Sequence, residues 1–218
     1  MLRLIVVVVS ALVVLFGTAA PVRAETAADV LLAKLAAADP DLRTYRADVA
    51  FDVGLHTFPY LRRTLHGNAY FKRPARMELV FSDLPPVARG FRNLYVGLGT
   101  PGDWAQKFAI TSARERVDGR EVSYLVLTPL AGDHRLREVD VYVDDAVALP
   151  QRIVWRYSDG QVEMRQRFGR VDGHDLIVAQ DADIHLPAVH AYVNARISNY
   201  ALNVDVDDAV FTPKKKSP

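Results

Sequence analysis

The stretch GNAYFKRPARMELVF, residues 67–81, carries two cations and a proline between two apolar runs. In each run an apolar residue recurs at every second position, which is typical of a strand with one buried and one solvated face. The repeat comprises Ala69, Phe71, Met77, Leu79 and Phe81. Proline interrupts strand pairing and favours a turn. The stretch therefore predicts a β-hairpin whose turn contains Lys72, Arg73 and Pro74.

The same alternation extends in both directions from this hairpin. In YRADVAFDVGL, residues 45–55, every odd position is apolar, and the parity continues through 61–71. Downstream, the segments 138–143 and 152–157 alternate in the same way, with Tyr142 on the solvated side. The alternation predicts strands that each present one apolar face to a common core.

Turn signals separate further strands. Asp159-Gly160 and Asp172-Gly173 are favoured hairpin dipeptides, and DDAVALP, residues 144–150, links two strands. Later strands are expected near 162–170, 175–184 and 191–204. In total we expect about nine to eleven strands and two main helices. This spacing predicts a mainly β, α+β fold built on a large, strongly curved antiparallel sheet.

Helical patterns occur in three segments. Residues 26–38 (TAADVLLAKLAAA) are rich in alanine and leucine, and Asp39-Pro40 ends this pattern. Residues 86–98 form a second candidate helix, although glycines weaken it. Residues 101–107 are expected to add a further helical turn.

The first 24 residues have the features of a signal peptide that is removed on export. A positive charge at Arg3 precedes an apolar run of thirteen residues, 4–16, and small residues lead to a cleavage site after Ala24. Cleavage after Ala20 is less favourable because Pro21 would follow the cut. An uncleaved anchor is the alternative, but the run is short for a membrane span of about 20 residues. We therefore expect a periplasmic protein.

The remaining chain is close to electrically neutral. Two of the 27 basic residues lie in the signal peptide, which leaves 25 against 26 acidic residues and a net charge of −1. This balance lacks the excess of basic charge that binding to nucleic acid requires. The basic run Lys214–Lys216 lies in the tail 214–218 and is expected to be solvated, with a contact to an anionic membrane as the alternative.

The chain contains no cysteine. This excludes disulfides, thiolate metal sites, a cysteine nucleophile and a lipid anchor on an N-terminal cysteine. The 194 residues after the signal peptide can bury a core without cross-links. We therefore expect a single domain, 25–213, followed by the basic tail.

Catalytic and phosphate-binding motifs are absent from the sequence. His185 and His190 lie five positions apart around a proline, which we interpret as placing them on no common strand face, so a metal site there is disfavoured. Asp205, Asp207 and Asp208 lack a calcium-loop template and are interpreted as solvated acids. We predict no catalytic residue, metal or cofactor, and an enzyme of unfamiliar type is the least favoured class.

Four segments resemble one family when taken in order. They are DVLLAKLAAADPDLRTYRADVAFDV (29–53), GNAYFKRPARMEL (67–79), VYVDDAVALPQRIVWRYSDGQVEMRQRF (141–168) and VNARISNYALNVDVDDAVFTP (193–213). They resemble segments of the LolA-type periplasmic lipoprotein carriers, which belong to the wider group of outer-membrane lipoprotein-sorting proteins. In order, they are similar to that family's first helix and strand, its G-x-x-x-x-x-[KR]-P hairpin, its late paired strands and its closing strand. The family's D-G-x-x-x-W-x-Y strand is not visible, and residues 85–108 take its place, so the lid is expected to differ.

The resemblance implies an incomplete antiparallel β-barrel of the LolA/LolB kind, with helices as a lid over a concave apolar side that holds acyl chains. Arg73 falls on the family's arginine that is tied to opening and closing of the lid, and Met77 falls where the family carries a cavity-facing aromatic residue. The implied partners are lipid or lipoprotein acyl chains, a transient inner-membrane donor and an outer-membrane acceptor. We expect a monomer.

A strongly curved sheet of this length has more apolar inner surface than two short helices can cover, which favours a cavity over a filled core. For each single residue an ordinary core position is the alternative. The residues predicted to bind lipid are Phe51, Phe71, Met77, Leu79, Phe81, Phe91 and Leu94. Arg73 is predicted to latch the lid through hydrogen bonds to helix carbonyls, with a surface arginine in a turn as the alternative.

These points predict a non-catalytic periplasmic carrier that moves lipids or lipoproteins toward the outer membrane. The alternative is an envelope sensor or interaction module of the same fold, which recognises lipids or lipoproteins and binds a protein partner. Lipid that co-purifies with the protein would favour the first function, and capture of a protein partner would favour the second.

Overall fold

The structure is a computed structural model. It describes residues 26–212, apart from 59, 75, 83–97, 99, 118, 132–134 and 145–147. The helices that lie wholly within the described residues are α1 (Ala27–Ala37), α3 (Pro101–Lys107) and the short 3-10 helix η2 (Asp208–Phe211). The strands are β1 (Thr44–Leu55), β2 (Arg62–Lys72), β3 (Arg76–Phe81), β4 (Phe108–Val117), β5 (Arg120–Pro129), β6 (Leu136–Asp144), β7 (Leu149–Tyr157), β8 (Gly160–Val171), β9 (His174–Leu186) and β10 (Val189–Leu202).

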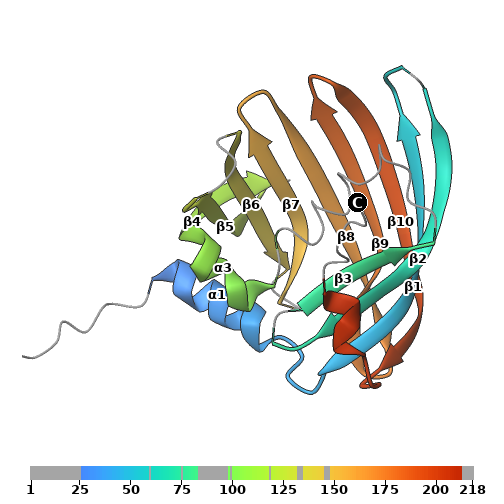
Figure 1. The fold of residues 1–218 in the computed structure, drawn as a ribbon. Helices are drawn as coiled ribbons and strands as arrows, with labels where there is room; N and C mark the ends of the chain where they lie inside the picture. The colour runs from blue at the N-terminus through green and yellow to red at the C-terminus, as the bar shows by residue number, and fades with distance from the viewer. Residues whose placement is uncertain are drawn as a thin grey trace, which may run out of the picture.

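All ten strands form one antiparallel sheet in the order β3-β2-β1-β10-β9-β8-β7-β6-β5-β4. Because β1 pairs with β10, the first and last strands of the chain meet within the sheet, and β3 and β4 form its two edges. Figure 1 shows the sheet curving strongly, with α1 and α3 close to the β4–β7 half. The sheet is not closed. The predicted fold, an incomplete antiparallel barrel with covering helices, is confirmed.

Both predicted hairpins are present, but only one of the two dipeptides forms the turn as the sequence predicted. Asp172 and Gly173 form the two-residue connection between β8 and β9, with φ of 46° and 88°. A type I′ turn needs positive φ at both central positions, which an Asp-Gly pair adopts readily. The β7–β8 connection consists of Ser158 and Asp159, and Gly160 already pairs with Tyr157 at the start of β8.

Alternation along the strands separates a concave apolar face from an outer face. In β1 the buried residues include Ala47, Val49, Phe51 and Val53, as the odd-position pattern predicted. Apolar residues from both halves of the sheet join in one core cluster with Leu31 and Leu35 of α1. The concave side is therefore where the sheet and the helices meet.

The outer face of the sheet is less exposed to solvent than the period-two alternation predicted. Tyr142 of β6 lies on that face but is only 4% exposed. Its ring stacks on Tyr124 at 4.6 Å between centroids, its hydroxyl donates to Glu115 at 2.6 Å, and the Arg152 guanidinium lies 4.7 Å from its ring centroid. Long neighbouring side chains thus bury a residue that the period-two pattern had placed in solvent.

The two main helices begin and end where local chemistry favours it. Thr26 caps α1 and forms a capping box with Asp29, and Asp39 follows the helix with φ of 56°. The predicted helical turn at 101–107 is α3, which has proline in its first turn. The predicted helix 86–98 lies outside the described residues except for Leu98. No helix in the described part of the chain is long and apolar enough to cross a membrane.

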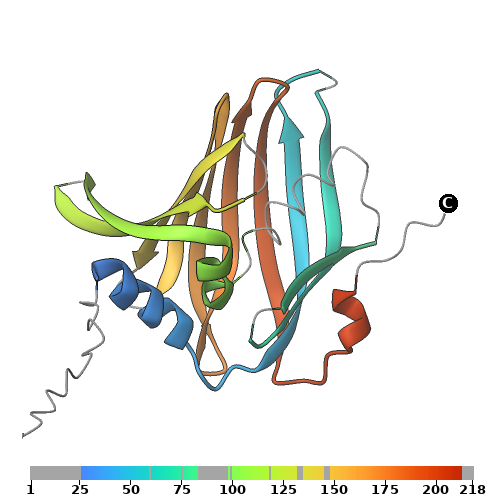
Figure 2. The ribbon, with the colours of Figure 1, turned by 60° about the vertical axis from the view of Figure 1, so that its left-hand side comes forward.

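The sequence pattern did not predict the individual strands of the β4–β5 hairpin. Most of β4 beyond Phe108 is exposed or half-buried, whereas Leu125 and Leu127 of β5 are fully buried. Figure 2 shows the far part of this hairpin projecting beyond the rest of the sheet. A strand that projects into solvent on both faces has no reason to alternate, so its sequence lacks the period-two signal.

Candidate functional site

A cavity of about 630 Å³ lies between the concave face of the sheet and the helices. Its volume falls within the range of about 300–1,000 Å³ that is usual for small-molecule sites. Its lining is mostly apolar and comes from α1 and the segment after it, α3, Leu98 and seven strands, from Met77 on β3 to Trp155 on β7. β3 and β7 are separated by five other strands in the sheet, so the curvature brings their side chains around one space.

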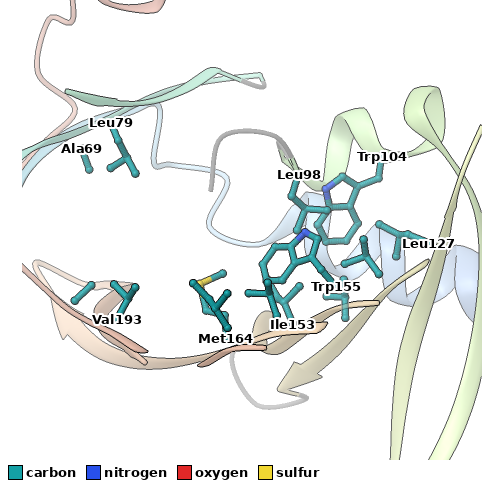
Figure 3. Packing of buried hydrophobic residues seen from close by; sticks show 14 of the residues in the cluster. Ala69, Leu79, Leu98, Trp104, Leu127, Ile153, Trp155, Met164 and Val193 are labelled. Atoms are coloured by element: carbon teal, nitrogen blue, oxygen red, sulfur yellow. The ribbon is translucent and has the colours of Figure 1, made fainter. Parts of the chain in front are cut away.

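One side of this cavity, here called the apolar wall, consists of Trp104, Ile153, Trp155 and Met164. All four side chains are buried, and the indole of Trp104 is only 1% exposed. Figure 3 shows Trp104 and Leu98 close to Trp155 and Ile153, with Met164 farther along the sheet. Helix α3 is thus fixed to β7 by large apolar side chains that also face the cavity.

Three aromatic residues line the cavity near the start of β1. The ring of Tyr45 stacks on Phe71 at 5.3 Å and meets Tyr200 edge-on at 5.4 Å. The Tyr200 hydroxyl donates to the carbonyl oxygen of Ile177 at 2.6 Å. Desolvation raises the pKa of Tyr45 to about 12 and also raises the pKa of Tyr200. Both phenols therefore stay neutral near pH 7 and add no charge to the lining.

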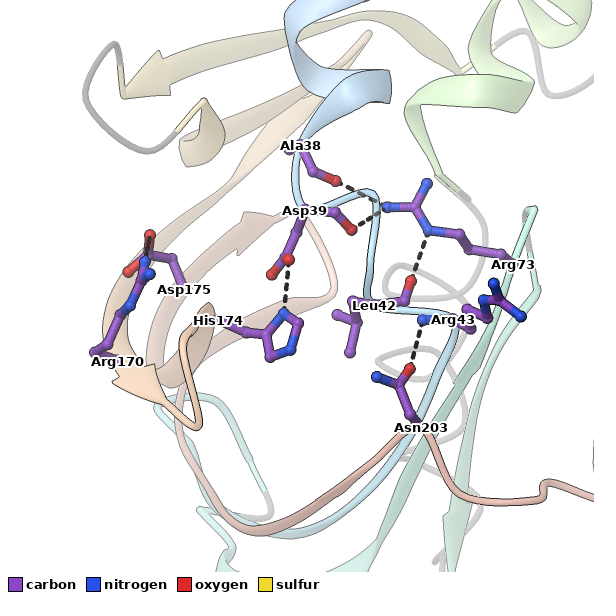
Figure 4. Close-up of polar contacts among 9 residues, drawn as sticks. All are labelled: Ala38, Asp39, Leu42, Arg43, Arg73, Arg170, His174, Asp175 and Asn203. Carbon is purple, nitrogen blue, oxygen red and sulfur yellow. Dashed lines mark hydrogen bonds and ion pairs between the residues drawn. The ribbon is translucent and has the colours of Figure 1, made fainter.

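The opposite side, here called the polar rim, is organised by Arg73 in the β2–β3 turn. Its Nε donates to the carbonyl oxygen of Leu42 at 2.6 Å, and its Nη2 donates to the carbonyl oxygens of Ala38 and Asp39 at 2.8 and 2.6 Å. Figure 4 shows the guanidinium pointing at the backbone that leaves α1. Carbonyls at a helix C-terminus lack partners within the helix and favour a cation, so Arg73 completes this end of α1.

A second contact of the polar rim holds the same segment from the other side. Asp39 Oδ1 lies 2.6 Å from Nδ1 of His174, which begins β9. Farther along, the backbone N–H of Arg43 donates to Asn203 Oδ1 at 2.8 Å. The segment between α1 and β1 is thus tied by polar contacts to the β2–β3 turn, the β8–β9 hairpin and the end of the last strand.

The structure divides the residues that the sequence predicted to bind lipid. Phe71 and Met77 line the cavity, as does Arg73, the predicted latch. Phe51 and Leu79 are buried in the core and Phe81 packs on Phe51 at 5.4 Å; these three are not among the lining residues. Phe91 and Leu94 lie outside the described residues.

Sequence reasoning missed several lining residues. Ile153 and Trp155 were recognised only as one face of a strand, and the single tryptophan of α3 gave no periodic signal. Gln166 lies in the buried register of β8, which is otherwise apolar at Val162 and Met164. A polar residue in the buried register of a strand is the signal that could have singled it out.

The structure also shows the contacts of the histidine pair and of Asp208, which the sequence had singled out. His185 and His190 are directly opposed on β9 and β10, with ring centroids 5.6 Å apart, so the prediction that they share no strand face is wrong. A two-residue hairpin loop brings them together. Asp208 pairs with Lys72 at 2.6 Å and Arg76 at 2.9 Å. The described residues contain no group of three or more side chains placed to hold a metal ion.

Comparison of the sequence with protein-family models and with curated proteins finds no match. Comparison of the fold finds solved structures that it resembles. A LolA superfamily protein from Nitrosomonas europaea has a TM-score of 0.61 and 14% identity, over 85% of this chain and 97% of that one. A DUF1329 family protein from Desulfovibrio piger has a TM-score of 0.58 and 15% identity, over 84% and 95%.

A third structure is a domain assigned to the outer membrane lipoprotein-sorting proteins of Vibrio parahaemolyticus. Its TM-score is 0.56 and its identity 10%, over 78% of this chain and 89% of that one. At these identities the likeness concerns the fold alone. The chain has a LolA-type fold.

Proposed function

We propose that this protein is a non-catalytic periplasmic carrier that binds acyl chains of a lipid or lipoprotein and moves them toward the outer membrane. The observation that carries this proposal is the cavity of about 630 Å³ with its mostly apolar lining. An acyl chain gains about 0.8 kcal/mol for each methylene that leaves water. For a chain of roughly sixteen carbons, exposure to water while crossing the periplasm would cost on the order of 12 kcal/mol of free energy.

The fold supports the proposal because related architectures occur in a LolA superfamily protein and in a lipoprotein-sorting domain. In the proposed role, Phe71 and Met77 contact the acyl chain directly, since they line the cavity. Phe51, Leu79 and Phe81 would support the lining residues from the core without contacting the acyl chain. The sequence-based candidates Phe91 and Leu94 stay predictions.

In this proposal Arg73 acts as a latch between the β2–β3 turn and α1. Its three acceptors are backbone carbonyls, which water can solvate when the guanidinium leaves. Release of these bonds would let α1 and the segment after it move away from the cavity, so cargo could enter or leave without disrupting the sheet. A transient donor at the inner membrane and an acceptor at the outer membrane complete the proposed route, with the carrier acting as a monomer after cleavage at Ala24.

The proposal is tested by purifying residues 25–218 from the periplasm without detergent, extracting them with organic solvent and analysing the extract by lipid mass spectrometry. We expect acylated material in a stoichiometric amount, and displacement of a fluorescent fatty-acid probe by the extracted lipid. A lipid-free protein that also fails to bind the probe would overturn the proposal.

A matched pair of variants on β3 locates the binding. Met77 faces the cavity, whereas Val80 is on the other face of the same strand and 38% exposed. Met77→Asp is expected to abolish probe binding, since it places a charge against the acyl chain, and Val80→Asp is expected to leave it unchanged. Transfer of bound lipid to acceptor vesicles then separates a carrier from a sensor, which would bind lipid without delivering it.

A further inference from the structure

Two glutamines lie side by side in the middle of the concave face. Gln166 of β8 is directly opposed to Gln180 of β9, and Gln180 is opposed on its other side to Ala195 of β10. Gln166 is 8% exposed and lines the cavity, whereas Gln180 is 2% exposed and lies beside Gln166 without being among the lining residues. Residues opposed in an antiparallel pair point to the same face, so both amides lie on the inner side of the sheet.

Three of the four polar atoms of these two amides are buried without a hydrogen-bond partner. Gln166 Oε1 and both Nε2 and Oε1 of Gln180 have no partner within the described structure. The great majority of buried polar side-chain atoms are paired, because leaving one unpaired costs about 1–3 kcal/mol. Leucine at both positions would avoid that cost, since this face of the sheet is otherwise apolar. The unpaired amides therefore point to a partner that comes from outside the chain.

The other unpaired polar atoms in the described residues cluster around the same space. They are Asp39 Oδ2, Thr100 Oγ1 and Trp104 Nε1, and all three residues line the cavity. Such atoms would be scattered through the fold if they reflected loose packing alone. Their gathering around one cavity is what an absent polar ligand group would leave behind.

The chemistry of the glutamine pair narrows the class of ligand group. The strand neighbours of the pair on the inner face include Met164, Ala182 and Ala195, which are apolar. A carboxylate or phosphate would be buried there without a counter-ion, at a large cost. The unpaired atoms of the two glutamines comprise two acceptors and one donor, so a group that binds them must both donate and accept. An ester can only accept, whereas a hydroxyl or a secondary amide does both.

We propose that Gln166 and Gln180 bind a hydroxyl or secondary-amide group carried by the acyl chain of the ligand. This inference rests on the proposed function, since it concerns the same cavity. It makes the preferred ligand a hydroxyacyl or N-acyl amphiphile and not a plain ester-linked chain. The hydroxyl or amide N–H donates to Gln166 Oε1, while the hydroxyl or carbonyl oxygen accepts from Gln180 Nε2.

Three matched neutral ligands test the inference by competition with a fluorescent acyl probe. They are methyl hexadecanoate, N-methylhexadecanamide and methyl hexadecanoate with a single hydroxyl on its chain. At least one of the latter two is expected to bind about tenfold more tightly than the plain ester, in keeping with two added hydrogen bonds. Which of the two gains affinity distinguishes the hydroxyacyl from the N-acyl source.

Variants of the pair separate recognition from a structural role. Gln166→Met and Gln180→Met keep the side-chain length and remove the amide. The preference for the hydroxyl or amide ligand over the plain ester should therefore fall to near onefold. The ligand-free variants should melt at no lower temperature than the wild type. Gln161→Met, at a glutamine of the same strand that does not line the cavity, serves as the matched control and should keep the preference.

Four outcomes would overturn the inference. Equal binding of all three ligands by the wild type, or a preference retained in both glutamine variants, overturns it while leaving the proposed carrier function intact. Loss of preference accompanied by a clearly lower melting temperature also overturns it, because that would assign the amides to the fold. Failure of every ligand and of the acyl probe to bind removes the proposed function and the inference together.

Discussion

The polar rim and the apolar wall close the same cavity by different physical means. At the rim, Arg73 holds the backbone after α1 with three hydrogen bonds to carbonyl oxygens. At the wall, the buried indoles of Trp104 and Trp155 hold α3 against the sheet. Water can replace a hydrogen bond to a carbonyl, but it cannot replace the contacts of a buried indole. In the proposed carrier we therefore expect the rim to open and the wall to fix the shape of the cavity.

The magnitudes support this division. A typical hydrogen bond contributes only about 0.5–1.5 kcal/mol net, because water competes for both partners. Truncation of a buried tryptophan costs about 3–5 kcal/mol. Substitutions at Trp104, Arg73 and Tyr45 are therefore expected to have effects of decreasing size.

The largest effect is expected at the wall. Trp104→Ala should lower the free energy of unfolding by about 3 kcal/mol, because the removed indole packs α3 onto the sheet and no side chain can refill its volume. Urea unfolding followed by circular dichroism measures this loss. Val30→Ala on α1, where the side chain is 45% exposed, is the control and should change stability by no more than about 0.5 kcal/mol. Equal stability of the two variants would break the comparison.

An intermediate effect on stability is expected at the rim, with a larger effect on exchange. Arg73→Leu should cost about 1 kcal/mol, since its carbonyl partners can turn to water, while the exchange of a fluorescent acyl probe becomes faster in stopped-flow mixing. Arg76→Leu is the matched control: this arginine is near the same turn but pairs with Asp208. If Arg73→Leu and wild type exchange the probe at the same rate, the latch is refuted.

The smallest effect concerns Tyr45, which stacks on Phe71 beside the rim, and it is expected only in alkaline solution. The folded pKa of Tyr45 is raised to about 12, above its ordinary value of 10.0, by desolvation. Folding therefore favours the neutral phenol, so its contribution to stability is complete below about pH 10 and is lost as the pH rises toward about 12.

Tyr45→Phe should remove part of this alkaline loss while leaving stability near pH 7 almost unchanged. The measurement is the urea midpoint of wild type and variant at about pH 8 and about pH 11. Some alkaline loss should persist in the variant, because the pKa of Tyr200 is raised as well. An identical decline in both proteins would show that Tyr45 ionises as freely in the folded state as in the unfolded one.

Much of the fold could be predicted from local patterns. The alternation in β1, the capping chemistry of α1 and the Asp172-Gly173 turn each depend on residues close together in the chain, so the sequence displays them directly. The projecting β4–β5 hairpin could not be resolved into its strands, since residues exposed on both faces follow no period. Tyr142 was misplaced because its burial comes from Tyr124 and Arg152, which lie on neighbouring strands.

The candidate site could be predicted only in part. Arg73 and its turn were evident from the hairpin sequence, and Phe71 and Met77 from their parity. The same parity selected Phe51 and Leu79, which lie in the core. Periodicity identifies the face on which a side chain lies, but not whether another side chain or an open space stands across from it.

The sequence by itself determined where the chain forms strands, helix and turns, because backbone preference and apolar period act over a few residues. The tertiary structure decided that β3 and β7 curve around one cavity, that Arg73 meets the carbonyls after α1, and that two glutamines on separate strands are directly opposed. Those features depend on sheet curvature and strand register, which are set by the packing of distant segments and leave no local trace in the chain.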